Sequence, residues 1–260
     1  MAYEFIKYEK QGHLTKITIN RPEVMNALHP PANQELSNAF DDFAADADAW
    51  VAIITGAGEK AFSAGNDLKY SAQHGMGASA TAGNGGFGGI TARFDLFKPV
   101  IAAVNGLALG GGFEIALACD IIVAAESARF GLPEPRVGLA ALAGGMQRLP
   151  RHIPPKLAMG LMLTGKPMLA PEAHRLGIVN EVVPLADLAK TAERWANEIL
   201  ECSPTSVRAT KQVALLSEGL PLEESMKKHY PAVGALFGSE DMMEGVMAFA
   251  QKRKPEWKGK

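Results

Sequence analysis

The chain has 260 residues, 47% of them hydrophobic and 21% charged, and its 26 Lys and Arg against 28 Asp and Glu give a formal net charge of −2. This length suits one α/β domain with a large core, and the charge balance argues against a surface that neutralises nucleic-acid or membrane phosphates. Two cysteines are too few for a disulfide framework, and neither a signal peptide nor a spanning apolar run is visible. We expect a soluble, cytoplasmic globular protein without nucleic-acid or membrane partners.

Short β-rich runs alternate with helical patterns over the first two thirds of the chain. Residues 14–19 (LTKITI) end at a turn signal, and residues 51–55 (VAIIT) form an apolar run typical of a strand buried on both faces. Residues 100–104 and 121–124 follow the same pattern, whereas residues 32–45 place apolar side chains at helical spacing. Strands separated by crossover segments predict an α/β fold with a mostly parallel sheet.

Residues 71–91 form a low-complexity stretch rich in Gly, Ala, Ser and Thr. Such a composition buries little apolar surface, so we expect a mobile loop or lid. Within it, residues 83–88 (GNGGFG) match the dinucleotide motif G-x-G-x-x-G. That motif must follow a strand and open a helix, so we do not interpret it as a cofactor site.

The pattern becomes helical beyond about residue 150, with Pro and Gly at the breaks. We expect helices at residues 154–163, 185–200, 203–216, 222–237 and 240–252. The six histidines are scattered, with no pair at i, i+4, so we expect no metal site.

Glu114 is the one charged residue in the apolar run 99–119 (PVIAAVNGLALGGGFEIALAC). A lone carboxylate there is costly to bury unless it is hydrogen-bonded or functional. It follows three glycines, residues 110–112, at a point where a helix would begin, and the free N–H groups of a first helical turn suit a developing oxyanion. The alternative is a tightly packed Gly-rich turn in which Glu114 merely stabilises the helix dipole.

Two further segments carry polar groups that could join Glu114. Residues 61–69 (AFSAGNDLK) form a small-residue turn whose alternative role is an ordinary surface turn with Asn66 or Asp67 as a helix cap. Glu134 follows Pro133, and its alternative is a solvated loop carboxylate. The two glutamates lie 134 − 114 = 20 residues apart, so only the fold could bring them together.

These segments resemble the crotonase family, also called the enoyl-CoA hydratase/isomerase superfamily. The run G-G-G-x-E-x-A-x-x-C-D is the most specific of them, and the resemblance covers essentially the whole chain. It is carried by Asn20-Arg21-Pro22, Asn26-Ala27-Leu28, residues 61–69, 104–124, 128–134 (ARFGLPE), 144–149 (GGMQRL) and the tail 248–257 (AFAQKRKPEW).

The resemblance implies an α/β fold, a crotonase-like spiral of ββα units with a C-terminal helical trimerisation region. On this basis we place the spiral core at residues 1–200 and the oligomerisation region at residues 201–260. The family implies a homotrimer or a dimer of trimers. It also implies an acyl-CoA substrate and no cofactor, with coenzyme A present only as part of the substrate.

The family's site residues map onto this sequence one by one. Glu114 and Glu134 match the two catalytic glutamates of the hydratases, and the backbone N–H groups of Asn66 and Gly111 match the pair that binds the thioester oxygen. The resemblance implies an enoyl-CoA hydratase, a hydro-lyase that adds water reversibly to a 2-enoyl-CoA. The substrate-binding positions are Val24, Ala27, Ala64, Asn66, Asp67, Leu68, Lys69, Gly111, Leu142 and Lys252.

One subgroup is similar in more detail, namely the carnitinyl-CoA dehydratases. Shared features include residues 54–65 (ITGAGEKAFSAG), 98–106 (KPVIAAVNG) and a tail of the form KRxPxWKG. Their acyl group carries a trimethylammonium, which favours an aromatic face. The candidate aromatic residues, which could equally be plain core or lid residues, are Tyr70, Phe87, Phe94 and Phe97.

The sequence departs from the family pattern at Leu142, in the segment 139–145 (LAALAGG), where a Pro-Gly pair is usual. We expect the Leu142 side chain to fill space near the acyl pocket. Two alternatives to a hydratase remain open within the family. One is a Δ3,Δ2-enoyl-CoA isomerase, which could use Glu134 alone, and the other is a non-catalytic RNA-binding protein, against which the lack of a basic cluster argues.

Overall fold

The computed structural model describes residues 3–75, 83 and 85–260. Its main sheet has the strand order β1-β2-β3-β5-β7-β10, in which β1 and β2 are antiparallel and the other neighbours are parallel. The strands are β1 Ile6–Gln11, β2 Leu14–Ile19, β3 Val51–Gly56, β5 Val100–Val104, β7 Ile121–Ala125 and β10 Glu181–Val183. The predicted α/β fold with a mostly parallel sheet is confirmed.

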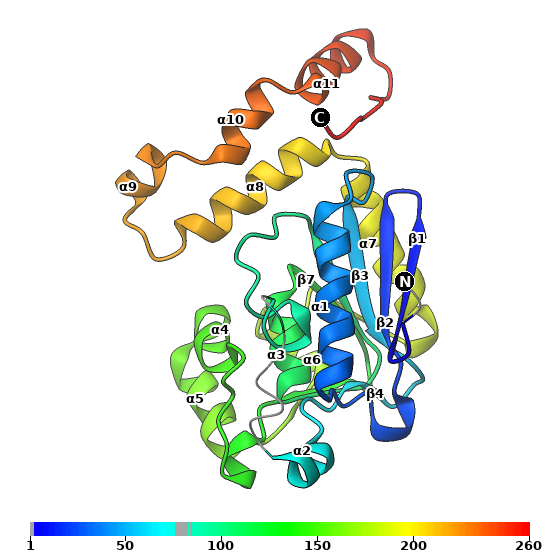
Figure 1. Ribbon diagram of the computed structural model, residues 1–260. Coiled ribbons are helices and arrows are strands. Elements are labelled where there is room, and N and C mark those ends of the chain that lie inside the picture. The colour runs from blue at the N-terminus through cyan, green and yellow to red at the C-terminus, as the bar shows by residue number, and fades with distance from the viewer. Residues whose placement is uncertain (1–2, 76–82, 84) are drawn as a thin grey trace.

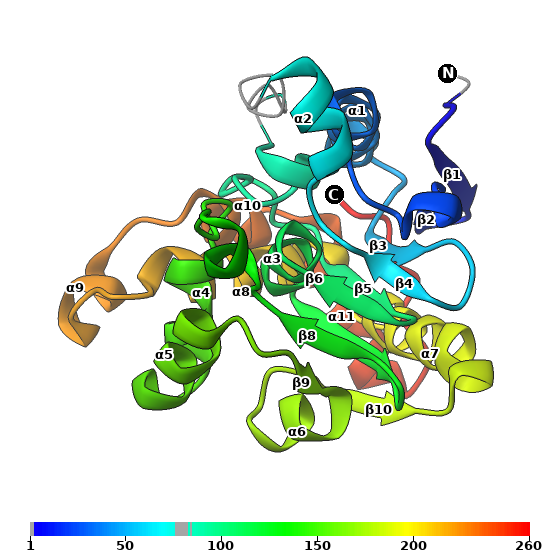
Figure 2. The same ribbon diagram turned by 90° about the horizontal axis from the view of Figure 1, so that it is seen from below.

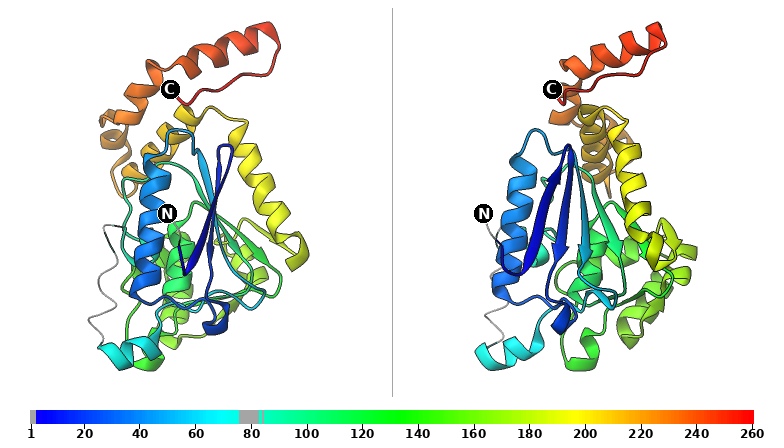
Figure 3. Two further views of the ribbon diagram at one scale, coloured as in Figure 1. Left: turned by 45° about the vertical axis from the view of Figure 1, so that its right-hand side comes forward. Right: turned by 90° about the vertical axis from the view of Figure 1, so that its right-hand side faces the viewer.

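The central strands β3, β5 and β7 of the main sheet are buried on both faces, as the apolar runs predict. Side chains alternate along a strand, so Val51 and Ile53 of β3 pack with α7 (Leu188–Leu200). Ala52 and Ile54 belong to the larger cluster on the other face, which includes side chains of α1 (Pro30–Ala45). Figure 3 shows α1 on one side of the sheet and α7 on the other.

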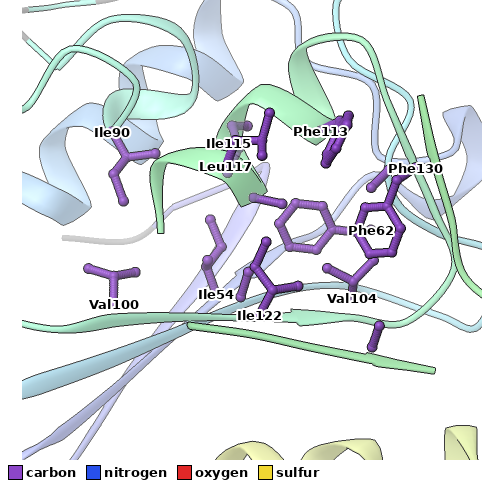
Figure 4. Close-up of a cluster of buried hydrophobic side chains, with 14 of the residues drawn as sticks. Ile54, Phe62, Ile90, Val100, Val104, Phe113, Ile115, Leu117, Ile122 and Phe130 are labelled. Carbon is purple, nitrogen blue, oxygen red and sulfur yellow. The ribbon is translucent and has the colours of Figure 1, made fainter. Parts of the chain in front are cut away.

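A second, smaller sheet has the order β4-β6-β8-β9. Its strands are β4 Ala61–Ser63, β6 Leu107–Leu109, β8 Arg129–Gly131 and β9 Met168–Leu169. Helix α3 (Gly111–Ala118) lies beside this sheet (Figure 2). Figure 4 shows Ile115 and Leu117 of α3 in one apolar cluster with Ile54. A nearly all-apolar helix is therefore held in the interior between the two sheets.

The remaining short helices connect these layers. They are the 3-10 turns η1 Pro22–Val24, η3 Phe87–Gly89, η4 Glu134–Val137 and η5 Leu185–Asp187, and the helices α2 Leu68–His74, α4 Gly145–His152, α5 Pro155–Thr164 and α6 Ala170–Arg175. The low-complexity stretch is partly packed, against expectation: Gly88 and Gly89 are buried, and Gly88 N–H donates to Asn33 Oδ1 at 2.8 Å. Residues 71–74 of the predicted lid belong to helix α2 instead of a loop. Residues 76–82 and 84 of the predicted lid lie outside the described residues.

Four C-terminal helices extend from the core as an arm (Figure 1): α8 Pro204–Ser217, α9 Leu222–Lys227, α10 Pro231–Phe237 and α11 Glu240–Gln251. The helix predicted over residues 222–237 is divided in two, because Pro231 opens α10 and cannot continue α9. Helix α8 is joined to the core by Lys211, whose Nζ lies 2.7 Å from Asp120 Oδ2 and donates to the Lys98 carbonyl.

Candidate active site

The N-terminus of α3 carries Glu114 in its first turn. Gly110 precedes the helix with φ +54°, a left-handed conformation that glycine adopts without strain. Its N–H donates to the Gly131 carbonyl at 2.9 Å, so β8 fixes the entry to the helix. Glu114 is only 3% exposed. The tightly packed Gly-rich turn that the sequence left open as an alternative is therefore present. A carboxylate as deeply buried as that of Glu114 nevertheless needs a hydrogen-bond partner inside the protein.

The turn after β4 lies directly against this helix N-terminus. A Cβ on Gly65 (φ +86°) would lie 2.7 Å from the Leu109 carbonyl oxygen and 2.8 Å from the Gly111 nitrogen, so only glycine allows this approach. The turn is also held by Leu28, whose N–H donates to the Gly65 carbonyl at 2.7 Å. Asn66 and Gly111 are therefore brought close together, and within the described residues neither backbone N–H has a hydrogen-bond acceptor. Two free donors at a helix start can bind an oxyanion.

Glu114 is held by the start of α4. The Gly145 N–H donates to Glu114 Oε1 at 2.8 Å. Burial raises the pKa of Glu114 to about 7, opposed by the N–H groups of Gly145 and Ala143 and by Arg148, and supported by the charge of Glu134. A carboxylate with a pKa near neutrality can accept a proton from water at physiological pH.

Glu134 lies beside the same helix N-terminus. It opens η4 after Pro133, and a Cβ on Gly110 would lie 3.1 Å from Glu134 Oε1. Its Oε2 is buried without a hydrogen-bond partner in the described part of the chain. Burial raises the pKa of Glu134, which favours a protonated carboxyl that can donate. The fold thus brings together the two glutamates that lie far apart in sequence.

Both glutamates line one cavity of about 1700 Å³. The sequence-predicted site residues on its wall are Ala64, Asn66, Leu68, Gly111, Glu114, Glu134 and Leu142. Leu142 lines this cavity and is 80% exposed, so within one chain it forms part of the cavity rim.

Other predicted binding residues lie outside this wall. Asp67 caps α2 by accepting from the Tyr70 N–H, and it forms an ion pair with Arg21 at 3.1 Å. Val24 and Ala27 belong to a turn beside β4, linked by the Ala64 N–H to the Met25 carbonyl at 3.0 Å. Lys69 is exposed on α2.

Lys252 follows α11 in the arm, at the opposite end of the molecule from α2 (Figure 1). One chain therefore does not bring Lys252 to the cavity.

The aromatic residues proposed for a cationic acyl group separate into two sets. Phe87 and Phe94 line the cavity, whereas Tyr70 and Phe97 are not among its lining residues. Tyr70 instead stacks on His74 with ring centroids 4.1 Å apart. The Phe94 ring already has a cation, because the Arg148 guanidinium carbon lies 5.9 Å from its centroid. Phe87 covers Gly111 so closely that a Cβ there would lie 2.3 Å from its ring. No hydrophobic periodicity in the sequence predicts the contact of Arg148 with Phe94 or that of Phe87 with Gly111.

Within the described residues, no cluster of His, Cys, Asp and Glu could hold a metal ion, and no helix is long and apolar enough to cross a membrane. The arrangement instead supports acid–base chemistry beside an oxyanion. One buried and one half-buried carboxyl, both with raised pKa values, line one cavity next to paired backbone donors. This combination defines a class of enzymes that stabilise an enolate-like charge.

The chain belongs to the enoyl-CoA hydratase/isomerase family, whose sequence profile matches residues 9–260. It is 44% identical to the carnitinyl-CoA dehydratase of Salmonella enteritidis PT4 (strain P125109) over 264 residues, which cover 99% of each chain. Among solved structures, an enoyl-CoA hydratase from Mycobacterium tuberculosis H37Rv has a TM-score of 0.92 at 39% identity, covering 98% of this chain and 99% of that one. Enoyl-CoA hydratase from Bacillus anthracis has a TM-score of 0.92 at 36% identity, covering 99% and 100%.

Proposed function

We propose that this protein is a hydro-lyase that adds water reversibly to the double bond of a 2-enoyl-CoA thioester. The observation that carries the proposal is the placement of Glu114 and Glu134 on one cavity beside the free N–H groups of Asn66 and Gly111. An isomerase could work with Glu134 alone, but the buried, hydrogen-bonded Glu114 favours a reaction that uses both carboxyls.

The thioester oxygen binds between the two backbone N–H groups. Donors aimed at developing negative charge are each worth roughly 3 kcal/mol in related oxyanion sites. As the enolate-like charge forms, these donors stabilise it without reorganising, because both are fixed by backbone packing. This placement puts the acyl C2 and C3 beside the carboxyls of residues 114 and 134.

Glu114 acts as the base and Glu134 as the acid. The ionised Glu114 takes a proton from water while the water oxygen bonds to C3, and the electrons of the double bond move toward the thioester oxygen. Glu134 then gives its proton to C2, and the product is a 3-hydroxyacyl-CoA. Exchange with solvent restores both protonation states, and the reverse sequence dehydrates the product.

A second candidate is the same reaction on crotonobetainyl-CoA, favoured by the 44% identity to a carnitinyl-CoA dehydratase. Its trimethylammonium would have to share the cavity with Arg148, which already lies over the Phe94 ring. The trimethylammonium acyl group and an uncharged acyl group of similar size therefore differ in binding energy chiefly through electrostatic interaction with Arg148.

Coenzyme A enters as part of the substrate, and we propose that the turn containing Val24 and Ala27, together with residues 64–69, binds it. Lys252 would then act from a neighbouring subunit, since it follows α11 in the arm and is not among the residues that line the cavity of its own chain. We further propose that the protein works in the cytoplasm as a homotrimer or a dimer of trimers.

The test is a panel of thioesters, in which hydration is followed by loss of the conjugated enoyl absorbance and isomerisation of a 3-enoyl-CoA by its gain. The panel contains crotonyl-CoA, longer 2-enoyl-CoA esters, crotonobetainyl-CoA and a 3-enoyl-CoA. We expect hydration of a 2-enoyl-CoA, and the preferred acyl group decides between the two candidates. Isomerisation of the 3-enoyl-CoA without hydration of any 2-enoyl-CoA would overturn the proposal.

A further inference from the structure

Arg148 is a half-buried cation that has no part in the reaction steps proposed for Glu114 and Glu134. It lies in α4, three residues after Gly145, and lines the cavity. In the described part of the chain its guanidinium forms no ion pair, whereas Arg151 on the same helix pairs with Glu218 at 3.2 Å. Holding a guanidinium without an ion-pair partner away from water is costly, so other contacts must stabilise it.

The first contacts are to the loop that holds Glu114. Arg148 Nη1 donates to the Ala143 carbonyl at 3.4 Å, and a Cβ on Gly144 would lie only 2.1 Å from the same Nη1. The guanidinium therefore lies against the backbone of residues 143–144. The next residue, Gly145, gives the N–H that binds Glu114, so the position of this donor depends on the loop that Arg148 supports.

The second contact is to Thr91, which also lines the cavity. Arg148 Nη2 donates to the Thr91 carbonyl at 2.8 Å, and the Thr91 hydroxyl donates to the Phe87 carbonyl at 3.0 Å. Phe87 in turn covers Gly111, one of the two oxyanion donors. One side chain thus joins the loop that orients the base to the segment that covers the oxyanion site.

We propose that Arg148 is a positioning residue for the hydration reaction, which fixes the Gly145 donor against Glu114 and ties this loop to the segment that carries Phe87. The inference rests on the proposed function. It does not require Arg148 to touch the reacting atoms.

The charges around the pair support the geometry. Burial and the Glu134 charge raise the pKa of Glu114, whereas Arg148 lowers it. Burial lowers the pKa of Arg148 itself. The charges of Glu114, Cys119 and Glu218 raise this pKa, and that of Arg151 lowers it. Removal of the Arg148 charge should therefore make Glu114 harder to ionise and move the acidic limb of the pH–rate profile to higher pH.

The experiment compares Arg148→Met and Arg148→Lys with wild type on the best 2-enoyl-CoA of the panel, with kcat and KM measured across pH. For Arg148→Met we expect kcat to fall about tenfold to a hundredfold, as small misplacements of catalytic groups do, with a smaller change in KM. Its acidic limb should move to higher pH. Arg148→Lys keeps the charge, so its acidic limb should stay near that of wild type while kcat still falls.

Arg151→Met is the matched control, because it removes a cation from the next turn of α4 that bonds to Gln147 and Glu218 instead of residues 91 and 143. It should leave kcat and the pH profile unchanged. An Arg148→Met enzyme with wild-type kcat and pH profile would overturn the inference, as would an equal effect of Arg151→Met. If Arg148→Met does not fold, an unchanged kcat in Arg148→Lys overturns it. Failure of wild type to hydrate any 2-enoyl-CoA would instead reject the proposed function.

Discussion

Glu114 is a buried carboxyl and Glu134 is a half-buried one with a buried Oε2, and their surroundings differ. Glu114 accepts a backbone N–H and lies near the Arg148 charge, both of which favour its ionised form. Glu134 has one oxygen without a hydrogen-bond partner among the described residues, which favours its protonated form. Burial raises the pKa of both carboxyls, so the proposed roles of base and acid rest on these different contacts and not on burial.

The first prediction concerns these two roles. Glu114→Gln and Glu134→Gln should each lower kcat by about 10²–10⁴-fold, the usual contribution of a general acid or base. Both changes nearly conserve volume, so the circular dichroism spectrum and the KM should change little. Steady-state assay of a 2-enoyl-CoA measures the effect. Turnover within about tenfold of wild type in both variants would contradict the assigned roles.

A second prediction follows from the burial of Glu114. Its pKa of about 7 in the folded protein exceeds the ordinary 4.5, so the folded state binds the proton more tightly. Stability is therefore lost as pH rises from about 4.5 to 7, by about 3 kcal/mol for this group. Glu114→Gln removes this loss, so relative to wild type its free energy of unfolding should rise by about 2–3 kcal/mol between pH 4.5 and pH 8.

Urea unfolding at both pH values and at one protein concentration measures this difference. Glu59→Gln is the control, because Glu59 is exposed in the turn before β4. It should give the same small difference from wild type at both pH values. A Glu114→Gln protein whose stability relative to wild type does not depend on pH would show that burial of Glu114 costs nothing on folding.

At the scale of elements, the oxyanion site depends on how closely β4 and α3 approach. Gly65 allows the contact, since a Cβ there would collide with the backbone of residues 109 and 111. Gly65→Ala should lower kcat/KM by about 10²–10³-fold, the loss found when one oxyanion donor is displaced. Gly160→Ala in α5 is the control, because a Cβ there meets nothing within 4 Å.

Kinetics and thermal unfolding of both glycine variants measure these effects. Gly160→Ala should keep full activity and gain about 0.5–1 kcal/mol of stability, since alanine favours a helix interior over glycine. Full activity in Gly65→Ala would contradict the role assigned to this close approach.

The same elements show what the sequence can predict. The apolar runs at 51–55 and 100–104 gave β3 and β5 nearly to the residue, because buried strands of this length have a clear pattern. The strands β4, β6, β8 and β9 have two or three residues each and no measurable period. Since this second sheet sets Asn66 beside Gly111, the site's geometry could be expected only from the family resemblance.

Amino-acid composition gives a wrong prediction of mobility where glycines are tightly packed. Gly88 and Gly89 lie in a stretch that composition predicts to be mobile, yet a Cβ on Gly88 would lie 2.4 Å from Ile115 Cδ1. Glycine here serves a close approach to α3 and not flexibility. Arg148 is a similar case, because only the folded chain shows that it joins residues 91 and 143.

At the scale of the whole molecule, the arm of α8–α11 presents apolar side chains to solvent. Leu222, Met226, Phe237, Met243, Val246 and Phe249 are all more than half exposed. Such a concentration of exposed apolar groups marks a surface that other protein covers. The proposed trimer supplies that cover from neighbouring copies of the chain.

The last prediction tests this assembly. Light scattering should give a mass of three or six times the 27.6 kDa chain. Phe249 is 88% exposed on α11, so Phe249→Glu should leave the single chain folded but shift the protein to smaller species, because an unpaired charge is costly to bury at an interface. Phe249→Leu keeps an apolar side chain and should keep the mass. A wild-type protein that stays monomeric at micromolar concentration would contradict the trimer, and with it the proposal that Lys252 serves a neighbouring active site.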